Sequence, residues 1–144
     1  MKYNRAVLDT NILVAASRSR NGASHAVLRA LREGRFTALA SVPLMLEYEA
    51  LLHRPEQLAA ANRTAAATTA FLDALAVLVE PVTFFYLWRP QTRDPGDEMV
   101  LETALNGCAD CIVTHNGADF HPAAARFRLA VLTPAEFLQQ LPEE

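Results

Sequence analysis

The sequence contains few cysteines, and this limits the classes of protein to which it can belong. Cys108 and Cys111 are the two cysteines among 144 residues, and they form a single C-x-x-C. A structural zinc ion usually takes four ligands, and a redox dithiol usually lies at a helix N-terminus, whereas this pair follows the end of a predicted helix. We therefore interpret both thiols as packing side chains.

Long apolar runs and an excess of positive charge are also missing. No run of 18 apolar residues occurs, so no membrane span is expected. Polar residues at positions 9 and 11 interrupt the first apolar stretch, which argues against a signal peptide and favours a cytoplasmic location. The formal net charge is −3, so the chain lacks the overall basic character on which non-specific duplex binding depends. Five arginines near the N-terminus could still form a local basic stripe or a solvated helix face: Arg18, Arg20, Arg29, Arg32 and Arg35.

What is present is a globular composition with alternating strand and helix patterns. Hydrophobic residues make up 51% and charged residues 20%, and the length fits one domain over residues 1–144. We predict strands over residues 5–8, 36–40, 82–88, 111–113 and 129–132. We predict helices over residues 11–16, 24–33, 43–53, 64–79, 97–107 and 134–141, with another starting at residue 55. Ser41 and Thr133 are expected to cap the helices that follow them. This alternation predicts an α/β fold with a mostly parallel sheet.

Two acidic residues follow predicted strands. Asp9 comes directly after the strand at residues 5–8, and Asp119 follows closely after the strand at residues 111–113. The carboxyl ends of parallel strands face the ligand crevice, so both carboxylates are expected at its mouth. Taken alone, Asp9 could simply cap a helix and Asp119 could simply form an Asx turn.

Two further acids lie on predicted helices. Asp97 precedes Val100, Leu101 and Ala104 by three, four and seven residues, which places it on the inward stripe of its helix. An N-cap role is the alternative for Asp97. Glu47 and Glu49 flank the apolar stripe of another helix on opposite sides, and periodicity does not choose between them.

A group of carboxylates at one end of a sheet suits Mg²⁺ or Mn²⁺, which take carboxylate and water oxygens. Divalent ions in such a site can stabilise the attacking and leaving oxygens of a phosphodiester displacement. The acids therefore favour metal-dependent phosphodiester chemistry over the other interpretations of each residue.

At this point the sequence resembles a known family, the PIN-domain ribonucleases. Residues 8–11 (Leu-Asp-Thr-Asn) resemble its opening motif, and Ser41 with residues 47–48 resembles the second. Residues 97–104 resemble the third motif and residues 113–120 the fourth. Within the family the chain most resembles the toxins of bacterial type II toxin–antitoxin pairs, which are VapC-like in the broad sense. The resemblance extends over essentially the whole chain.

The resemblance implies a three-layer α/β/α fold, bound Mg²⁺ or Mn²⁺, endoribonuclease activity on RNA, a homodimer and a cognate antitoxin. It assigns the shared acids to Asp9, Glu47 and Asp97, and so prefers Glu47 to Glu49. Asn116 stands where a fourth acid is frequent, and Asp119 is its replacement, which leaves the number of metal ions open. The supporting polar residues are Thr10, Asn11, Thr114 and Asn116.

Two alternatives remain beside the toxin, and a third is set aside. The chain could be a structure-specific or repair nuclease, or a non-catalytic nucleic-acid or protein-binding module with the same fold. An aspartyl-phosphate enzyme would also begin with an acid at a strand end. Such phosphatases resemble Asp-x-Asp there, however, and Asn11 occupies the place of the second acid.

Overall fold

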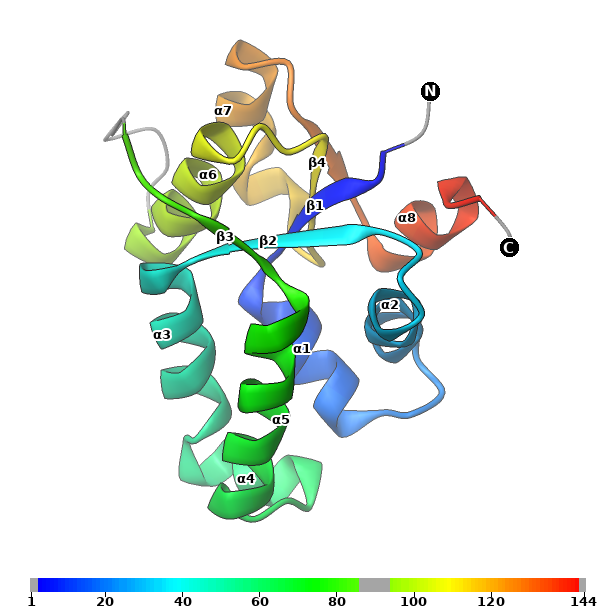
Figure 1. Ribbon diagram of the computed structural model, residues 1–144, viewed down its shortest axis with the longest axis vertical. Coiled ribbons are helices and arrows are strands. Elements are labelled where there is room, and N and C mark those ends of the chain that lie inside the picture. Colours follow the sequence, from blue (N-terminus) through cyan, green and yellow to red (C-terminus); the bar gives the residue numbers. More distant parts are fainter. Residues whose placement is uncertain (1–2, 86–93, 143–144) are drawn as a thin grey trace.

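A computed structural model describes residues 3–85 and 94–142 and shows a sheet of five parallel strands (Figure 1). The strands lie in the order β3-β2-β1-β4-β5, with β1 at the centre. Each neighbouring pair is parallel, which confirms the predicted class of fold. The strands are β1 (Arg5–Leu8), β2 (Thr37–Ser41), β3 (Glu80–Val82), β4 (Cys111–Val113) and β5 (Ala130–Leu132).

Helices cover both faces of the sheet and complete the three layers. On one face α6 packs against β1, β2 and β4, and α7 packs against β5. On the other face lie α1, α2 and α8, which contact one another in that order (Figure 1). The helices are α1 (Thr10–Arg18), α2 (Ala23–Arg32), α3 (Val42–Leu52), α4 (Pro55–Ala61), α5 (Ala65–Leu78), α6 (Pro95–Asn106), α7 (His121–Arg126) and α8 (Pro134–Gln140), with a 3₁₀ turn η1 (Gly117–Asp119). None of these helices is long and apolar enough to cross a membrane.

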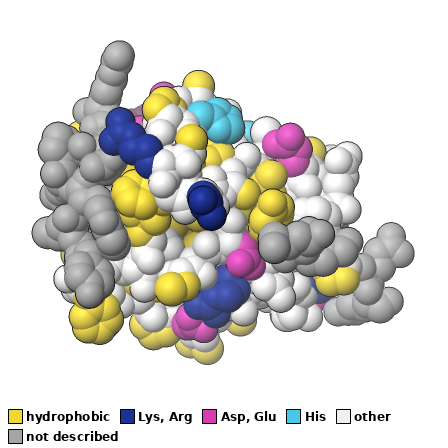
Figure 2. Space-filling view, turned by 90° about the horizontal axis from the view of Figure 1, so that it is seen from above, with side chains coloured by type: hydrophobic (Ala, Val, Ile, Leu, Met, Phe, Trp, Pro, Cys, Tyr) yellow, Lys and Arg dark blue, Asp and Glu magenta, His cyan; other side chains and the backbone are white. Residues whose placement is uncertain are grey.

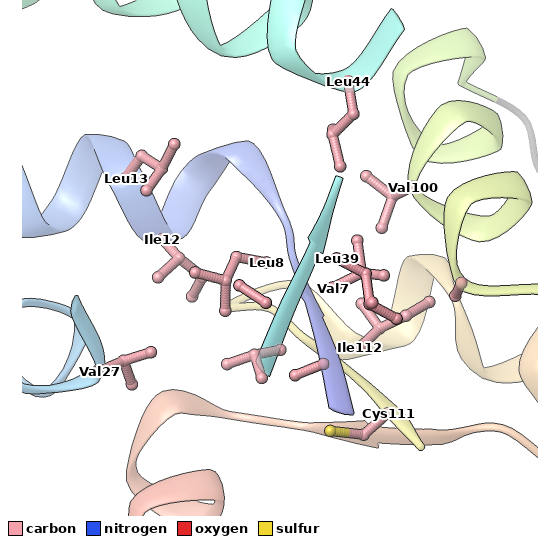
Figure 3. Packing of buried hydrophobic residues seen from close by; sticks show 14 of the residues in the cluster. Val7, Leu8, Ile12, Leu13, Val27, Leu39, Leu44, Val100, Cys111 and Ile112 are labelled. Atoms are coloured by element: carbon pink, nitrogen blue, oxygen red, sulfur yellow. The ribbon is translucent and has the colours of Figure 1, made fainter. Parts of the chain in front are cut away.

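The core lies on both sides of the central strand. Leu8 points toward Ile12 on one side, and Val7 points toward Val100 on the other (Figure 3). A parallel strand covered on both faces buries successive residues instead of alternate ones, and Val7 and Leu8 are accordingly both buried. The apolar run at residues 6–8 is therefore explained by its place in the sheet.

Capping residues set the starts of several helices as expected. The Ser41 hydroxyl accepts a hydrogen bond from the backbone N–H of Leu44, and α3 starts with proline in its first turn. Thr133 and Glu136 form a reciprocal capping box at the start of α8. Both predicted caps are confirmed.

The predicted strand at residues 82–88 is wrong in its bounds. The observed edge strand β3 ends at Val82, residues 83–85 lie outside it, and residues 86–88 fall outside the described residues. Val82 pairs with Ser41, where β2 ends and α3 begins, so β3 has no strand backbone to pair with beyond that point. Helix α7 was not predicted. It follows the fully buried Phe120 and is only six residues long, which is too short for a helical hydrophobic period to stand out in the sequence.

Candidate active site

The topology of the sheet brings the ends of β1 and β4 together. The chain leaves β1 toward β2 on one side and leaves β4 toward β5 on the other, so the connections diverge between β1 and β4. Leu8 pairs with Val113, and the next residues along the two strands, Asp9 and Thr114, are therefore neighbours. Such a switch point at the carboxyl ends of parallel strands is where α/β proteins hold ligands.

The Asp9 carboxylate is fixed by hydrogen bonds to both of its oxygens. Oδ1 accepts from the backbone N–H of Thr10 at 2.8 Å, which makes Asp9 the N-cap of α1. Oδ2 accepts from the Thr114 hydroxyl at 2.7 Å. Burial raises the pKa of Asp9, the two hydrogen bonds oppose that rise, and nearby Asp119 and Asp94 add to it. Asp9 therefore does cap α1, and its carboxylate also lies at the edge of a cavity.

That cavity has a volume of about 250 Å³ and an acidic lining. All four acids singled out in the sequence line it, although they come from four separate segments: Asp9, Glu47, Asp97 and Asp119. The remaining lining residues are Thr10, Asn11, Leu51, Asp94, Gly96 and Asn116. No lysine or arginine lies among these lining residues, all of which belong to the described part of the chain.

Helix α3 presents Glu47 to the cavity and also anchors the end of β1. The buried Tyr48 hydroxyl donates to the backbone carbonyl of Leu8 at 2.5 Å. This bond ties α3 to the strand that carries Asp9. Glu49 is exposed and does not line the cavity, so the geometry favours Glu47 where periodicity left both open.

Asp97 faces the cavity from the first turn of α6. Asp94 is the N-cap of this helix, and its Oδ1 accepts from the Gly96 N–H at 2.7 Å, so Asp97 is not the cap. Partial burial and the neighbouring carboxylates, chiefly that of Asp9, raise the pKa of Asp97 to about 6. A carboxylate whose pKa is raised in this way belongs to a site where negative charge is concentrated.

The sequence analysis was wrong or incomplete on four acids of this region. Asp97 is half-buried at the cavity, not in the middle of the buried stripe formed by Val100 and Leu101. Glu98 and Glu102 are buried instead, and neither was singled out. Asp94 was not singled out either, although it also lines the cavity. Its position three residues before Asp97, in the loop at the start of the same helix, is the signal that could have found it.

The polar residues expected to support the site form a connected set around Thr114. The Asn11 amide donates to Thr114 Oγ1 at 3.3 Å, and the Asn116 backbone N–H donates to the same oxygen at 3.0 Å. Thr10 contributes its backbone N–H to Asp9. Thr114 is fully buried, so its hydroxyl has a fixed position from which to orient Asp9.

The donor chemistry of the cavity fits a hard divalent cation. In the described residues, no three Asp, Glu, His or Cys side chains are arranged closely enough to hold an ion by themselves. Mg²⁺ does not require such a cage, because it usually binds through one or two carboxylates and keeps several waters. A cavity of about 250 Å³ lined by carboxylates leaves room for those waters.

Three of the arginines near the N-terminus make contacts away from the acidic cavity. The Arg18 Nε donates to Gln57 at 2.7 Å, Arg35 lies 4.0 Å from Glu33, and Arg32 lines an apolar groove elsewhere. On the face seen in Figure 2, basic and acidic side chains are interspersed with hydrophobic ones, without a continuous basic patch.

Comparisons with known proteins agree with this geometry. No curated protein matches the chain. The chain is similar in structure to the crystal structure of VapBC2 from Rickettsia felis bound to a DNA fragment from their promoter, with a TM-score of 0.59 and 17% sequence identity. That match covers 90% of this chain and 98% of the other, and it supports the fold. Residues 5–118 match the PIN domain family, a range that includes Asp9, Glu47 and Asp97. The chain therefore belongs to the PIN domain family, as its motifs and its five-stranded parallel sheet indicate.

Proposed function

We propose that this chain is a metal-dependent endoribonuclease and the toxin of a toxin–antitoxin pair. The observation that carries the proposal is the acidic cavity at the end of β1 and β4, lined by carboxylates from four segments and by no described basic residue. PIN domains are generally nucleases, and the structural neighbour is a toxin–antitoxin complex. The whole described chain serves as one domain that builds this site.

Asp9, Glu47, Asp97 and Asp119 would hold Mg²⁺ or Mn²⁺ through carboxylate oxygens and water. When bound, such an ion supplies an activated water and stabilises charge on the phosphodiester oxygens. Thr114 and the Thr10 N–H hold the Asp9 carboxylate in one orientation. The raised pKa of Asp97 shows that negative charge is crowded where the cation would bind, and a bound cation would relieve that crowding.

The direct test is cleavage of RNA by the purified chain with Mg²⁺ or Mn²⁺, and with a chelator. We expect cleavage with metal alone, and a loss of roughly 10²–10³-fold in Asp9→Asn and Asp97→Asn, the scale of removing one preorganised charge-stabilising group. Asp73→Asn is the matched control, because Asp73 is exposed on α5 and does not line the cavity. Cleavage that survives in both cavity variants would contradict the proposal. Preference for structured DNA over RNA would favour a repair nuclease, and metal-independent binding without cleavage would favour a non-catalytic module.

An antitoxin would have to neutralise the acidic cavity, and a second surface offers it a further anchor. An apolar groove of about 100 Å³ between α1, α2 and α5 includes Leu28, Phe71 and Leu75, and its basic residues are Arg32 and Arg63. The Arg63 guanidinium lies 5.4 Å from the Phe71 ring centroid. No acid lines this groove within the described residues. It suits a segment with apolar and acidic side chains.

Helix α1 connects the two surfaces. Thr10 lines the acidic cavity and Ser17 lines the apolar groove, seven residues apart on the same side of the helix. Seven residues of α-helix extend about 10 Å. An antitoxin segment with apolar and acidic residues in the groove could therefore place Arg or Lys beside Asp9 and Asp97. Growth unaffected by expression of this chain alone would count against the toxin assignment.

A second copy of the chain has a suitable surface of its own. Val42 and Leu46 are 72% and 59% exposed and line a depression between α3, α5 and β3. None of the residues lining this depression is charged, so two copies meet there without like-charge repulsion. We expect Leu46→Glu to convert a dimer to a monomer in sedimentation experiments without unfolding it, since the side chain is exposed. A monomeric wild type would contradict this part of the proposal.

A further inference from the structure

A buried hydroxyl on α2 contacts an exposed histidine from the far end of the sequence. Ser24 lies in the first turn of α2 and is 3% exposed. Its Oγ is 2.8 Å from Nε2 of His115, which lies in the loop after β4. The histidine side chain is exposed, so the contact fixes the ring in a place where it would otherwise be free to rotate.

The same histidine belongs to the turn that supports Asp9. The His115 backbone N–H donates to Asn11 Oδ1 at 3.3 Å. Thr114, directly before it, donates to Asp9 Oδ2 at 2.7 Å. Asn116, directly after it, donates its backbone N–H to Thr114 at 3.0 Å. A continuous series of contacts thus leads from the buried Ser24 to the carboxylate at the cavity.

We propose that His115 is a positioning residue, which Ser24 clamps to α2 so that the turn at residues 114–116 holds the Asp9 carboxylate toward the cavity. This inference rests on the proposed function, because it gives the clamp a role in holding the metal ion. Groups that orient metal ligands through hydrogen bonds change metal affinity by about 10–100-fold when lost. His115 acts through Thr114 instead of bonding to Asp9 directly, so the expected change in metal affinity is smaller, about three- to tenfold.

A purely structural role predicts a different outcome. If the histidine only satisfies the buried Ser24 hydroxyl, its removal lowers thermal stability and leaves metal affinity unchanged. His53 provides the matched control, because its Nε2 makes the same kind of contact with the Thr69 hydroxyl at 3.0 Å on α5, away from the cavity residues. His53 lies at the C-terminal end of α3, and its side-chain contacts are with Glu49, Ala65 and Thr69, none of which lines the cavity.

The experiment compares His115→Ala, His115→Gln, Ser24→Ala, the Ser24→Ala/His115→Ala double variant and His53→Ala. We expect Mn²⁺ affinity, measured by calorimetry, to fall three- to tenfold in each single alanine variant of the pair, and kcat to fall with it while KM changes little. The double variant should be no worse than either single one, because the two residues form one contact. His115→Gln should restore most of the affinity, since its amide reaches about as far as Nε2, and His53→Ala should leave affinity unchanged.

Amide hydrogen exchange of the metal-free protein separates this inference from the proposed function. In His115→Ala and Ser24→Ala the N–H groups of residues 115 and 116 should lose protection about three- to tenfold, while His53→Ala leaves them unchanged. If the wild type neither binds Mn²⁺ nor cuts RNA, the proposed function fails and the role toward the metal fails with it. If the wild type binds Mn²⁺ but affinity and exchange are unchanged in both alanine variants, the proposed function stands and the positioning role of His115 is overturned.

Discussion

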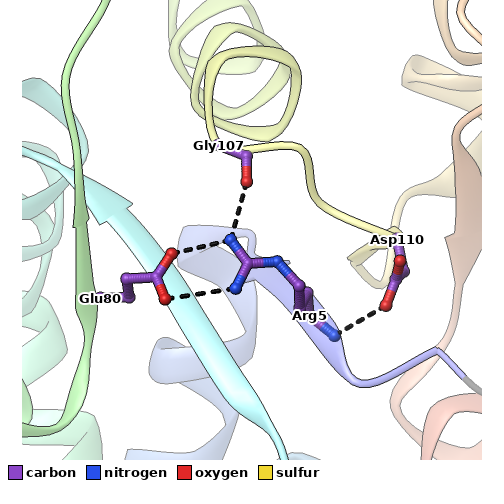
Figure 4. A network of polar contacts seen from close by, with 4 residues as sticks. All are labelled: Arg5, Glu80, Gly107 and Asp110. Carbon is purple, nitrogen blue, oxygen red and sulfur yellow. Dashed lines mark hydrogen bonds and ion pairs between the residues drawn. The ribbon is translucent and has the colours of Figure 1, made fainter.

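Charged side chains are arranged in opposite ways at the two ends of the parallel sheet. At the carboxyl end, Asp9 and Asp97 face other carboxylates around one cavity, and the pKa of each is raised. At the amino end, Arg5 of β1 reaches across the sheet and pairs with Glu80 of β3 at 2.7 Å (Figure 4). The Arg5 guanidinium holds the pKa of Glu80 below its usual range. One end is held together by paired charges and the other concentrates charges of one sign.

The amino end is joined by backbone contacts as well. Arg5 also donates to the Gly107 carbonyl at 2.9 Å, where α6 ends. The Asp110 carboxylate accepts from the backbone N–H groups of Asn4 and Arg5, both at 3.0 Å (Figure 4). These bonds connect β1, β3 and the turn before β4. A fold can tolerate repulsion between like charges at a functional end when paired charges and hydrogen bonds stabilise its opposite end.

Metal binding should give the largest effect and acts at the carboxyl end alone. An ion that binds the folded state stabilises it by about 2.7 kcal/mol at a hundred times its Kd. Asp97→Asn removes one of the crowded charges while keeping its shape, so without metal it should melt at least as high as the wild type. With millimolar Mg²⁺ or Mn²⁺ it should gain clearly less. An identical metal-induced shift of the melting temperature in the two proteins would exclude Asp97 as a ligand.

Close packing at the amino end predicts the next effect. A Cβ at Gly107 would lie 2.8 Å from Val82 Cγ2 and 3.0 Å from the Thr103 carbonyl oxygen. Gly107→Ala should therefore lower the free energy of unfolding by about 1–3 kcal/mol, the usual cost of overpacking. Denaturant unfolding measures this loss. The metal-induced shift should stay that of the wild type, and a changed shift would mean that the two ends are coupled.

The pH dependence of stability should have opposite signs at the two ends. Asp97 has a folded pKa of about 6, above its unfolded value, so its proton stabilises the folded state as the pH falls from about 6 toward 4. The pKa of Glu80 is lowered, so its contribution is present at neutral pH and is lost as the pH falls through its folded pKa. Melting temperatures measured from neutral pH down past the folded pKa of Glu80 should show that Asp97→Asn reduces the gain, of which Asp9 keeps a part, and that Glu80→Gln removes the loss. A gain as large in Asp97→Asn as in the wild type would contradict the crowding of carboxylates.

The ion pair at the amino end should give the smallest effect. The Arg5 and Glu80 side chains are 35% and 46% exposed, so water and salt screen their attraction. A double-mutant cycle of Arg5→Gln and Glu80→Gln should give a coupling energy of about 0.2–1 kcal/mol that shrinks at high salt. A coupling well above that range would mean that the pair, and not the backbone contacts of Asp110, holds this end together.

The sequence by itself determined the class of fold, most strand and helix positions, and the acids worth testing. Apolar runs, capping residues such as Ser41 and Thr133, and acids after strands are local signals, and each depends on a few neighbouring residues. The carboxylate pattern pointed to Asp9, Asp97 and Asp119, and the family resemblance chose Glu47 over Glu49. Helical periodicity places both glutamates beside the same apolar stripe. Only the folded structure decides which of them faces the cavity.

Only the tertiary structure decided the features that depend on distant segments. The end of β3 at Val82 follows from where β2 stops offering backbone partners, and Asp94 joined the cavity because α6 lies beside β1 and β4. The contact of Ser24 with His115 joins residues 91 positions apart. No local pattern encodes such contacts, because they arise when the sheet order places the ends of β1 and β4 beside helices from other parts of the chain.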